Sequence, residues 1–98
     1  LYVTTDSGAI ENIYTLQLAN MDREMHEFTI SISGLEGATL IGDTVHTLNG
    51  GEIRSISMRV REDPELLTQP STAFTFDVQA TDAPQLRISS ESRFMKPL

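Results

Sequence analysis

Met21, Met25 and His26 are the residues of this chain whose types and spacing could bind a metal ion. They place two thioethers and an imidazole within one predicted turn. Thioether sulfur and imidazole nitrogen are ligands that suit copper, and Cu(I) in particular. The same stretch also fits a plain turn, in which a methionine is partly packed and the histidine begins the next strand. The sequence therefore leaves two interpretations open, a copper-binding turn and a structural turn.

Catalytic chemistry finds little support in the other polar residues. Two histidines and many acids could be combined on paper into a Ser–His–acid triad, but no serine lies in a nucleophile elbow. The acidic pairs Glu62 with Asp63 and Asp22 with Glu24 fall in predicted turns, where a solubilising role explains them. The glycines mark turns and lack the strand–loop–helix context of a phosphate site. We therefore expect a domain that is not an enzyme.

The elements that carry these residues are predicted to be strands, because apolar and polar residues alternate with period two. Residues 11–20 show this pattern, with Tyr14, Leu16 and Leu18 on one side. A second alternating run, residues 26–33, follows a polar turn. We expect these two strands to pair with each other in an antiparallel arrangement.

About seven short strands are predicted in total, separated by turn signals roughly every eight to twelve residues. They cover residues 1–5, 11–20, 26–33, 44–48, 52–61, 72–80 and 85–95. Asp6-Ser7-Gly8 is a turn signal, and Asn49-Gly50-Gly51 is the strongest candidate for a tight hairpin turn. Residues 62–67 form a polar connector, in which Pro64 suits the start of one helical turn.

This pattern predicts an all-β fold, an antiparallel two-sheet sandwich of the fibronectin or immunoglobulin-like kind. The chain has neither cysteine nor tryptophan, so it lacks the disulfide and tryptophan of antibody domains. Asn12 and Tyr14 are expected to be structural, as a polar cap and a half-buried aromatic. The predicted core consists of the inward apolar residues of the strands. These are Tyr14, Leu16, Leu18, Phe28, Ile30, Ile32, Ile56, Met58, Val60, Phe74, Phe76, Val78 and Ile88.

Composition narrows the class of protein further. The 98 residues are expected to form a single domain, residues 1–98. The absence of cysteine excludes a zinc–thiolate site or an iron–sulfur cluster within this chain.

A net charge of −7 argues against nucleic acid or anionic lipid as a partner. No apolar run approaches the roughly 20 residues that cross a bilayer, so we expect no membrane insertion of this piece. The first residue is not Met, and we expect a fragment of a longer protein.

Basic residues gather late in the chain, and three of them fall on the predicted strand 52–61. Arg54, Arg59 and Arg61 are candidates for a basic docking edge that contacts a protein partner. The alternative is an ordinary solvated face.

Three segments carry a resemblance to a known family. Residues 11–16 read E-N-I-Y-T-L and are followed by Asn20, residues 48–52 read L-N-G-G-E, and residues 91–97 read E-S-R-F-M-K-P. They resemble the E-N-x-Y-x-L, hairpin and E-S-x-F-x-x-P segments of the C-terminal immunoglobulin-like domain of the FixG family, also called CcoG. Residues 1–2 resemble the tail of the family's R-N-x-L-Y segment. The resemblance spans essentially all 98 residues.

The resemblance implies a parent that is a polyferredoxin of the bacterial inner membrane, named for nitrogen fixation. Its 4Fe-4S clusters would lie upstream, on the cytoplasmic side, while this domain would be periplasmic. Such proteins assist assembly of a haem–copper terminal oxidase, by reducing copper on its way to the enzyme. The redox chemistry cannot reside in this piece, because it has no cysteine.

Three hypotheses about function follow. The first is a non-catalytic accessory domain without a cofactor of its own, which docks an oxidase subunit, a copper chaperone or the parent's membrane core. The second is a copper-binding domain that uses Met21, Met25 and His26. The third is a spacer β-sandwich of an unrelated extracellular protein.

Overall fold

The structure, a computed structural model, describes residues 2–5 and 7–97, and within them the fold is all-β, as predicted. Leu1 and Asp6, which belong to the predicted strand 1–5 and to the predicted turn at 6–8, lie outside the described residues. The strands are β1 (Tyr2–Thr4), β2 (Ile10–Ala19), β3 (His26–Ser33), β4 (Thr39–Ile41), β5 (Val45–Leu48), β6 (Ile53–Glu62), β7 (Ser71–Ala80) and β8 (Arg87–Met95). A 3-10 turn, η1 (Pro64–Leu66), forms where one helical turn was predicted, with Asp63 as its N-cap.

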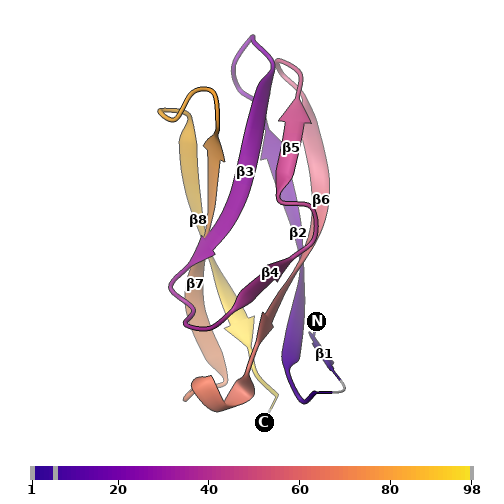
Figure 1. The fold of residues 1–98 in the computed structure, drawn as a ribbon, viewed down its shortest axis with the longest axis vertical. Coiled ribbons are helices and arrows are strands. Elements are labelled where there is room, and N and C mark those ends of the chain that lie inside the picture. The colour runs from indigo at the N-terminus through magenta and orange to yellow at the C-terminus, as the bar shows by residue number, and fades with distance from the viewer. Residues whose placement is uncertain (1, 6, 98) are drawn as a thin grey trace.

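The strands form two four-stranded antiparallel sheets that pack face to face (Figure 1). Sheet A has the order β1-β2-β6-β4, and sheet B has the order β5-β3-β7-β8. This is an immunoglobulin-like sandwich without a disulfide, so the predicted fold class is confirmed. β4 is an additional short strand that the count of about seven did not include.

The predicted pairing of residues 11–20 with residues 26–33 is wrong. β2 pairs with β6 over ten positions, from Ile10 opposite Glu62 to Ala19 opposite Ile53. β3 lies in the other sheet, between β5 and β7. Each of the two strands has one apolar face, and in a sandwich such faces are buried by turning toward each other from opposite sheets. The connecting turn therefore carries the chain across the sandwich.

The glycine turn at Asn49-Gly50-Gly51 is correctly predicted as a turn but is not a hairpin. β5, before it, pairs with β3, whereas β6, after it, pairs with β2. Gly51 has a φ of +76°, and the N–H of Glu52 donates to the carbonyl of Asn49 at 3.1 Å. The turn thus has tight geometry and joins the two sheets.

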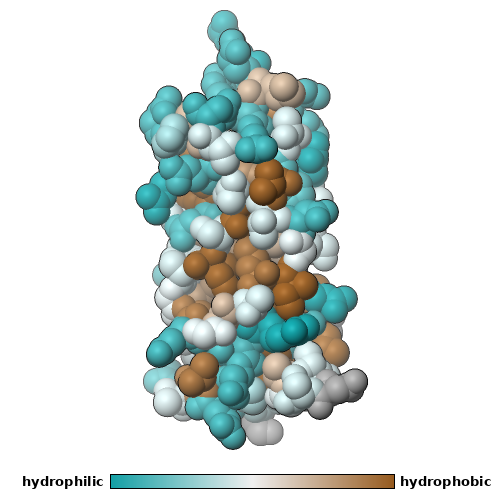
Figure 2. All heavy atoms as spheres, in the orientation of Figure 1, coloured by the Kyte–Doolittle hydropathy of each residue, from teal (hydrophilic) through white to brown (hydrophobic). Residues whose placement is uncertain are grey.

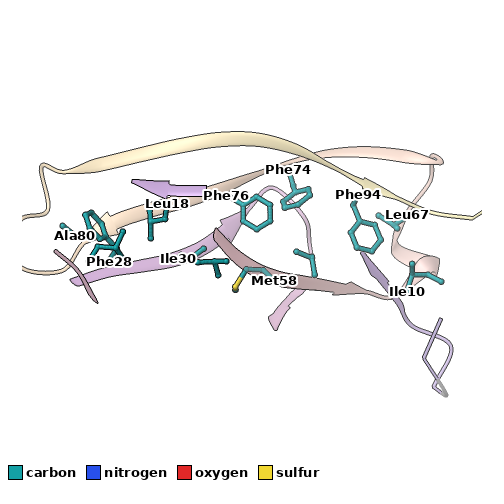
Figure 3. Close-up of a cluster of buried hydrophobic side chains, with 13 residues drawn as sticks. Ile10, Leu18, Phe28, Ile30, Met58, Leu67, Phe74, Phe76, Ala80 and Phe94 are labelled. Carbon is teal, nitrogen blue, oxygen red and sulfur yellow. The ribbon is translucent and has the colours of Figure 1, made fainter. Parts of the chain in front are cut away.

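The core fills the space between the sheets and follows the predicted inward faces (Figure 3). Of the predicted core, only Ile88 is wrong, with 66% of its surface exposed. It lies opposite Val78 and therefore shares the inner face of sheet B, but it is on the edge strand β8, where no described strand of sheet A covers it. Ile10, Leu48 and Leu67 are buried core residues that the pattern did not identify.

The sandwich is incompletely covered along the edge that carries β4. This strand has only three residues, and Leu40 and Ile41 remain partly exposed. Figure 2 shows apolar side chains gathered at mid-height on this side of the molecule, over β4. Within residues 2–5 and 7–97, no helix is long and apolar enough to cross a membrane.

Candidate functional site

His26 is held between two loops at one end of the sandwich. It is the first residue of β3 and is only 8% exposed. Its Nε2 lies 2.6 Å from a carboxylate oxygen of Asp22, and its Nδ1 lies 2.9 Å from one of Asp82. Because both ring nitrogens face carboxylates, the charged imidazolium can donate on both sides. Asp22, and then Asp82, raise the pKa of His26, and His26 lowers the pKa of Asp22.

This geometry bears on the predicted copper-binding turn. Met21 is 91% exposed and Met25 is 60% exposed, while both nitrogens of His26 are bonded to carboxylates. In the described part of the chain, no three His, Cys, Asp or Glu side chains are placed to hold a metal ion. A copper ion that used His26 would first have to displace Asp22 or Asp82 from the ring. Binding of copper by Met21, Met25 and His26 stays a prediction.

Arg59 and Arg61 lie on the outer face of sheet A, where they share one carboxylate. Glu11 of β2 is only 4% exposed, because the two arginines and its neighbours cover it. The Arg61 side chain donates to Oε2 of Glu11 at 2.8 Å and 2.5 Å, and Arg59 donates to Oε1 at 3.3 Å. The hydrogen bonds from Arg61, and to a smaller extent the one from Arg59, lower the pKa of Glu11. Both guanidinium groups are thereby oriented while about half of each side chain stays exposed.

Arg54 does not belong to this face, so the three predicted docking arginines are divided. Successive side chains of a strand point to opposite faces, so Arg54 points to the same face as the buried residues Ile56 and Met58. It lies at the end of the inner face, where it pairs with Glu52 at 2.8 Å and donates to the carbonyl of Thr47 at 3.1 Å. Arg54 therefore braces the junction between β5 and β6.

Apolar side chains flank Arg59, and one lies in the same row as Arg61. Directly opposite residues of neighbouring strands share a face. Ile13 and Ile41 lie on either side of Arg59, and Val3 shares the row of Glu11 and Arg61. We call Val3, Glu11, Ile13, Ile41, Arg59 and Arg61 the arginine face. Partly exposed aliphatic side chains beside oriented arginines match the composition of protein–protein interfaces.

The two sheets are clasped together by side chains of β2 that reach the backbone of β8. The amide of Asn12 donates to the carbonyl of Met95 at 3.0 Å, and the N–H of Met95 donates back to Asn12 at 2.8 Å. The Tyr14 hydroxyl donates to the carbonyl of Arg93 at 2.8 Å. Burial raises the pKa of Tyr14 to about 12. The structural roles predicted for Asn12 and Tyr14 thus correspond to contacts between sheets.

Asn20 joins the two sheets at the opposite end of the sandwich, where it contacts the turn between β5 and β6. It is 1% exposed, and its amide nitrogen lies within hydrogen-bond distance of the carbonyls of Glu24, Leu48 and Asn49. The N–H of Gly51 donates to the carbonyl of Asn20 at 2.9 Å. At Gly50, any Cβ would lie 2.0 Å from a backbone oxygen of the adjacent β2–β3 turn. The two turns are therefore packed too closely for any residue but glycine.

Glu62 corrects another expectation, since the sequence suggested a solubilising carboxylate in a turn. It is the last residue of β6 and is 1% exposed. One of its oxygens accepts the N–H of Asp63 at 3.0 Å, and burial raises its pKa. Glu62 is two residues from the buried Val60 and therefore lies on the inner face, but the predicted strand ends one residue earlier, at residue 61.

A groove opens between the sheets along the side formed by β2 and β8. Two adjoining hollows of about 320 and 520 Å³ lie there. Apolar side chains supply most of the lining, chiefly Leu16, Leu18, Phe28, Val78, Leu86 and Ile88. Met21 and Ile88 stand exposed at the rim. Among the described residues that line the groove, the titratable side chains are those of Asp22 and Arg87.

Comparisons with known proteins identify the family. A family model described as "IG-like fold at C-terminal of FixG, putative oxidoreductase" matches residues 1–97. The chain belongs to this FixG C-terminal family. It is similar to a solved structure of a FixG-related protein from Vibrio parahaemolyticus, with a TM-score of 0.86 and 25% sequence identity, and the match covers 100% of this chain and 93% of that one. No curated protein matches the chain.

The segments that carried the resemblance to FixG meet one another in the structure. Residues 11–16 provide the clasp to residues 93–95, which belong to the closing segment. Asn20 binds the turn at residues 48–52. These FixG segments are thus the complementary halves of two contacts that join the sheets. They account for the fold and leave the exposed surfaces as candidates for function.

Proposed function

We propose that this chain is a non-catalytic docking domain of a FixG-type protein and that it binds a protein partner through the arginine face. Membership of the FixG C-terminal family supports the proposal that the parent is a FixG-type protein. The observation that supports a docking surface is the pair Arg59 and Arg61, which Glu11 orients. The parent would be an inner-membrane protein with 4Fe-4S clusters upstream, active in assembly of a haem–copper terminal oxidase and in copper handling. The domain would lie on the periplasmic side.

The chemistry of the face indicates what the partner presents. Two arginines share one carboxylate, which leaves about one positive charge on this face of a chain whose net charge is −7. Guanidinium groups bind carboxylates in a planar, two-point geometry, and Arg59 keeps donor capacity because its bond to Glu11 is long. We therefore expect an acidic group on the partner, beside apolar surface that covers Ile13 and Ile41. An oxidase subunit, a copper chaperone and the parent's own membrane part are the candidate partners.

The test is co-purification from membranes that contain the intact parent protein. The pair of substitutions Arg59→Gln and Arg61→Gln removes both donors from the arginine face. Arg87→Gln with Arg93→Gln is the matched control, because it removes the same charge from β8 in the other sheet. We expect recovery of the bound oxidase-assembly partner to fall roughly five- to tenfold for the first pair and to be unchanged for the control.

Equal recovery from both variants, with folding verified by urea unfolding, would contradict the docking surface. If the variant with Arg59→Gln and Arg61→Gln loses the partner but the level of assembled oxidase stays unchanged, the assembly role alone is contradicted. The copper-binding turn has a separate test, a Cu(I) titration of the domain followed by NMR. Binding no tighter than to the triple alanine variant of Met21, Met25 and His26 would end that hypothesis.

A further inference from the structure

β2 has an unpaired edge for most of its length. On one side it pairs with β6 at all ten positions. On the other side, β1 pairs only with Ile10, Glu11 and Asn12. In the part of the chain that the structure describes, no strand lies beside residues 13–19 on that side. The edge strand therefore offers seven residues to an additional strand.

The hydrogen-bond pattern identifies the free backbone groups. The N–H of Asn20 donates to Glu52 on the β6 side, and the N–H of Thr5 donates to Ala9 on the β1 side. Because antiparallel residues alternate in the side to which they bond, odd-numbered residues of β2 face the open side. These residues are Ile13, Thr15, Gln17 and Ala19. The N–H and C=O groups of all four point away from β6.

This edge lacks the features that usually prevent strand addition. Proteins protect exposed edges with charged residues, proline or bulges. Residues 13–19 contain no charged residue and no proline, and their pairing with β6 runs without a bulge. The apolar groove lies directly beneath, lined by Leu16 and Leu18 of β2 and by Ile88 of β8. An uncharged edge above an apolar groove is the combination that β-strand addition uses.

The direction and register of β1 indicate which segment fills the edge. β1 runs antiparallel to β2 with Tyr2 opposite Asn12 and Thr4 opposite Ile10. When this register is continued backward, the six residues that precede Leu1 in the parent fall opposite residues 14–19. In Figure 1, the N-terminal end of β1 points along β2 toward that edge. The family is described as the fold at the C-terminus of FixG, so such a protein has chain before this domain.

We propose that the parent segment immediately before Leu1 extends β1 along the free edge of β2 and covers the groove. Its residues opposite Tyr14, Leu16 and Leu18 would turn their side chains toward the apolar groove, because opposite residues share a face. The added strand would tie this domain rigidly to the preceding part of the parent. The inference rests on the family and on β1, and it is independent of the arginine face.

Hydrogen exchange of backbone amides tests the proposal on two forms of the protein. One form is the 98-residue chain, and the other is extended by the parent residues that precede Leu1. We expect the amides of Thr15, Gln17 and Ala19, which face the added residues, to exchange at least tenfold more slowly in the extended form. Unchanged exchange would overturn the proposal. Protection in the 98-residue form that rises with protein concentration would also overturn it, since a second copy would then occupy the edge.

A proline substitution provides the second readout. The N–H of Thr15 faces the open side, so Thr15→Pro removes no bond to β6 and edge strands tolerate it. In the extended form, the same substitution should abolish the slow exchange at Gln17 and Ala19. Thr15→Ala is the matched control, because it keeps the N–H. Slow exchange that survives Thr15→Pro in the extended form would refute strand addition at this edge.

Discussion

Asn12→Ala should destabilise the domain, because Asn12 makes two of the three hydrogen bonds that clasp β2 to β8. Asn12 donates to and accepts from the backbone of Met95, at 3.0 Å and 2.8 Å. Each hydrogen bond contributes about 0.5 to 1.5 kcal/mol net, and leaving a shielded backbone group without a partner adds to the loss. Because Met95 is partly exposed, water can replace some of the lost bonds. We expect a loss of about 2 to 3 kcal/mol, a large share of the roughly 5 to 15 kcal/mol of a typical domain.

Urea unfolding measures this loss, and hydrogen exchange locates it. For a domain of this size, the urea midpoint should fall by about 2 M. Asn12→Asp keeps the acceptor for the Met95 N–H, but it loses the donor and places a carboxylate oxygen against the Met95 carbonyl at a position that is 3% exposed, so at pH 7 it should destabilise the domain at least as much as Asn12→Ala. Gln17→Ala, on the exposed side of the same strand, is the control and should change the free energy of unfolding by less than about 0.5 kcal/mol. A loss below that value for Asn12→Ala, with the Met95 amide still protected, would refute the clasp.

Further substitutions test other parts of the structure. Phe94→Ala, at a fully buried ring, should cost about 3 to 5 kcal/mol in thermal or urea unfolding, whereas Met95→Ala beside it should cost far less. Gly50→Ala should cost more than about 2 kcal/mol, because its Cβ would overlap a backbone oxygen. The pKa of His26 is raised in the folded domain, so the stabilisation that the charged ring gives to the fold is fully present below pH 6.5 and is lost as the pH rises through the raised pKa. His26→Gln should therefore lower the free energy of unfolding more at pH 6 than at pH 9. Burial raises the pKa of Glu62, so the ionised carboxylate destabilises the fold as the pH rises above 4.5. Glu62→Gln should therefore stabilise the domain at pH 7 but not at pH 4.

Period-two alternation located most of the strands and most of the core, because it reports which face of a strand is buried. It does not report which strand lies alongside. The alternation of β2 is equally compatible with β3 or β6 as its neighbour, and the turn after β2 has no feature that distinguishes a hairpin from a crossing between sheets. For the same reason, the glycines at Gly50 and Gly51 predicted a tight turn but not its topology.

The candidate site was only partly predictable. The sequence identifies Arg59 and Arg61 as candidates. Arg54 lies two residues from the buried Ile56, so the alternation of the strand already places it on the opposite face from them. Their partner Glu11 could not be inferred without the register of β2 against β6, which places Glu11 opposite Arg61. Asp82 is 56 residues from His26 in sequence, and no local pattern connects them.

The separation between the clasps and the exposed surfaces affects how mutational data on FixG-type domains should be interpreted. Asn12 and Asn20 join the sheets through half-buried and buried hydrogen bonds, and Tyr14 joins them through an exposed one, so their substitution lowers the stability and the amount of folded domain. Loss of function at these residues therefore carries no information about the partner. Arg59 contributes little buried area, and its neutralisation should leave the fold intact. A variant that folds normally but fails to support the parent is informative, and the arginine face and the open edge of β2 are where such variants should be sought.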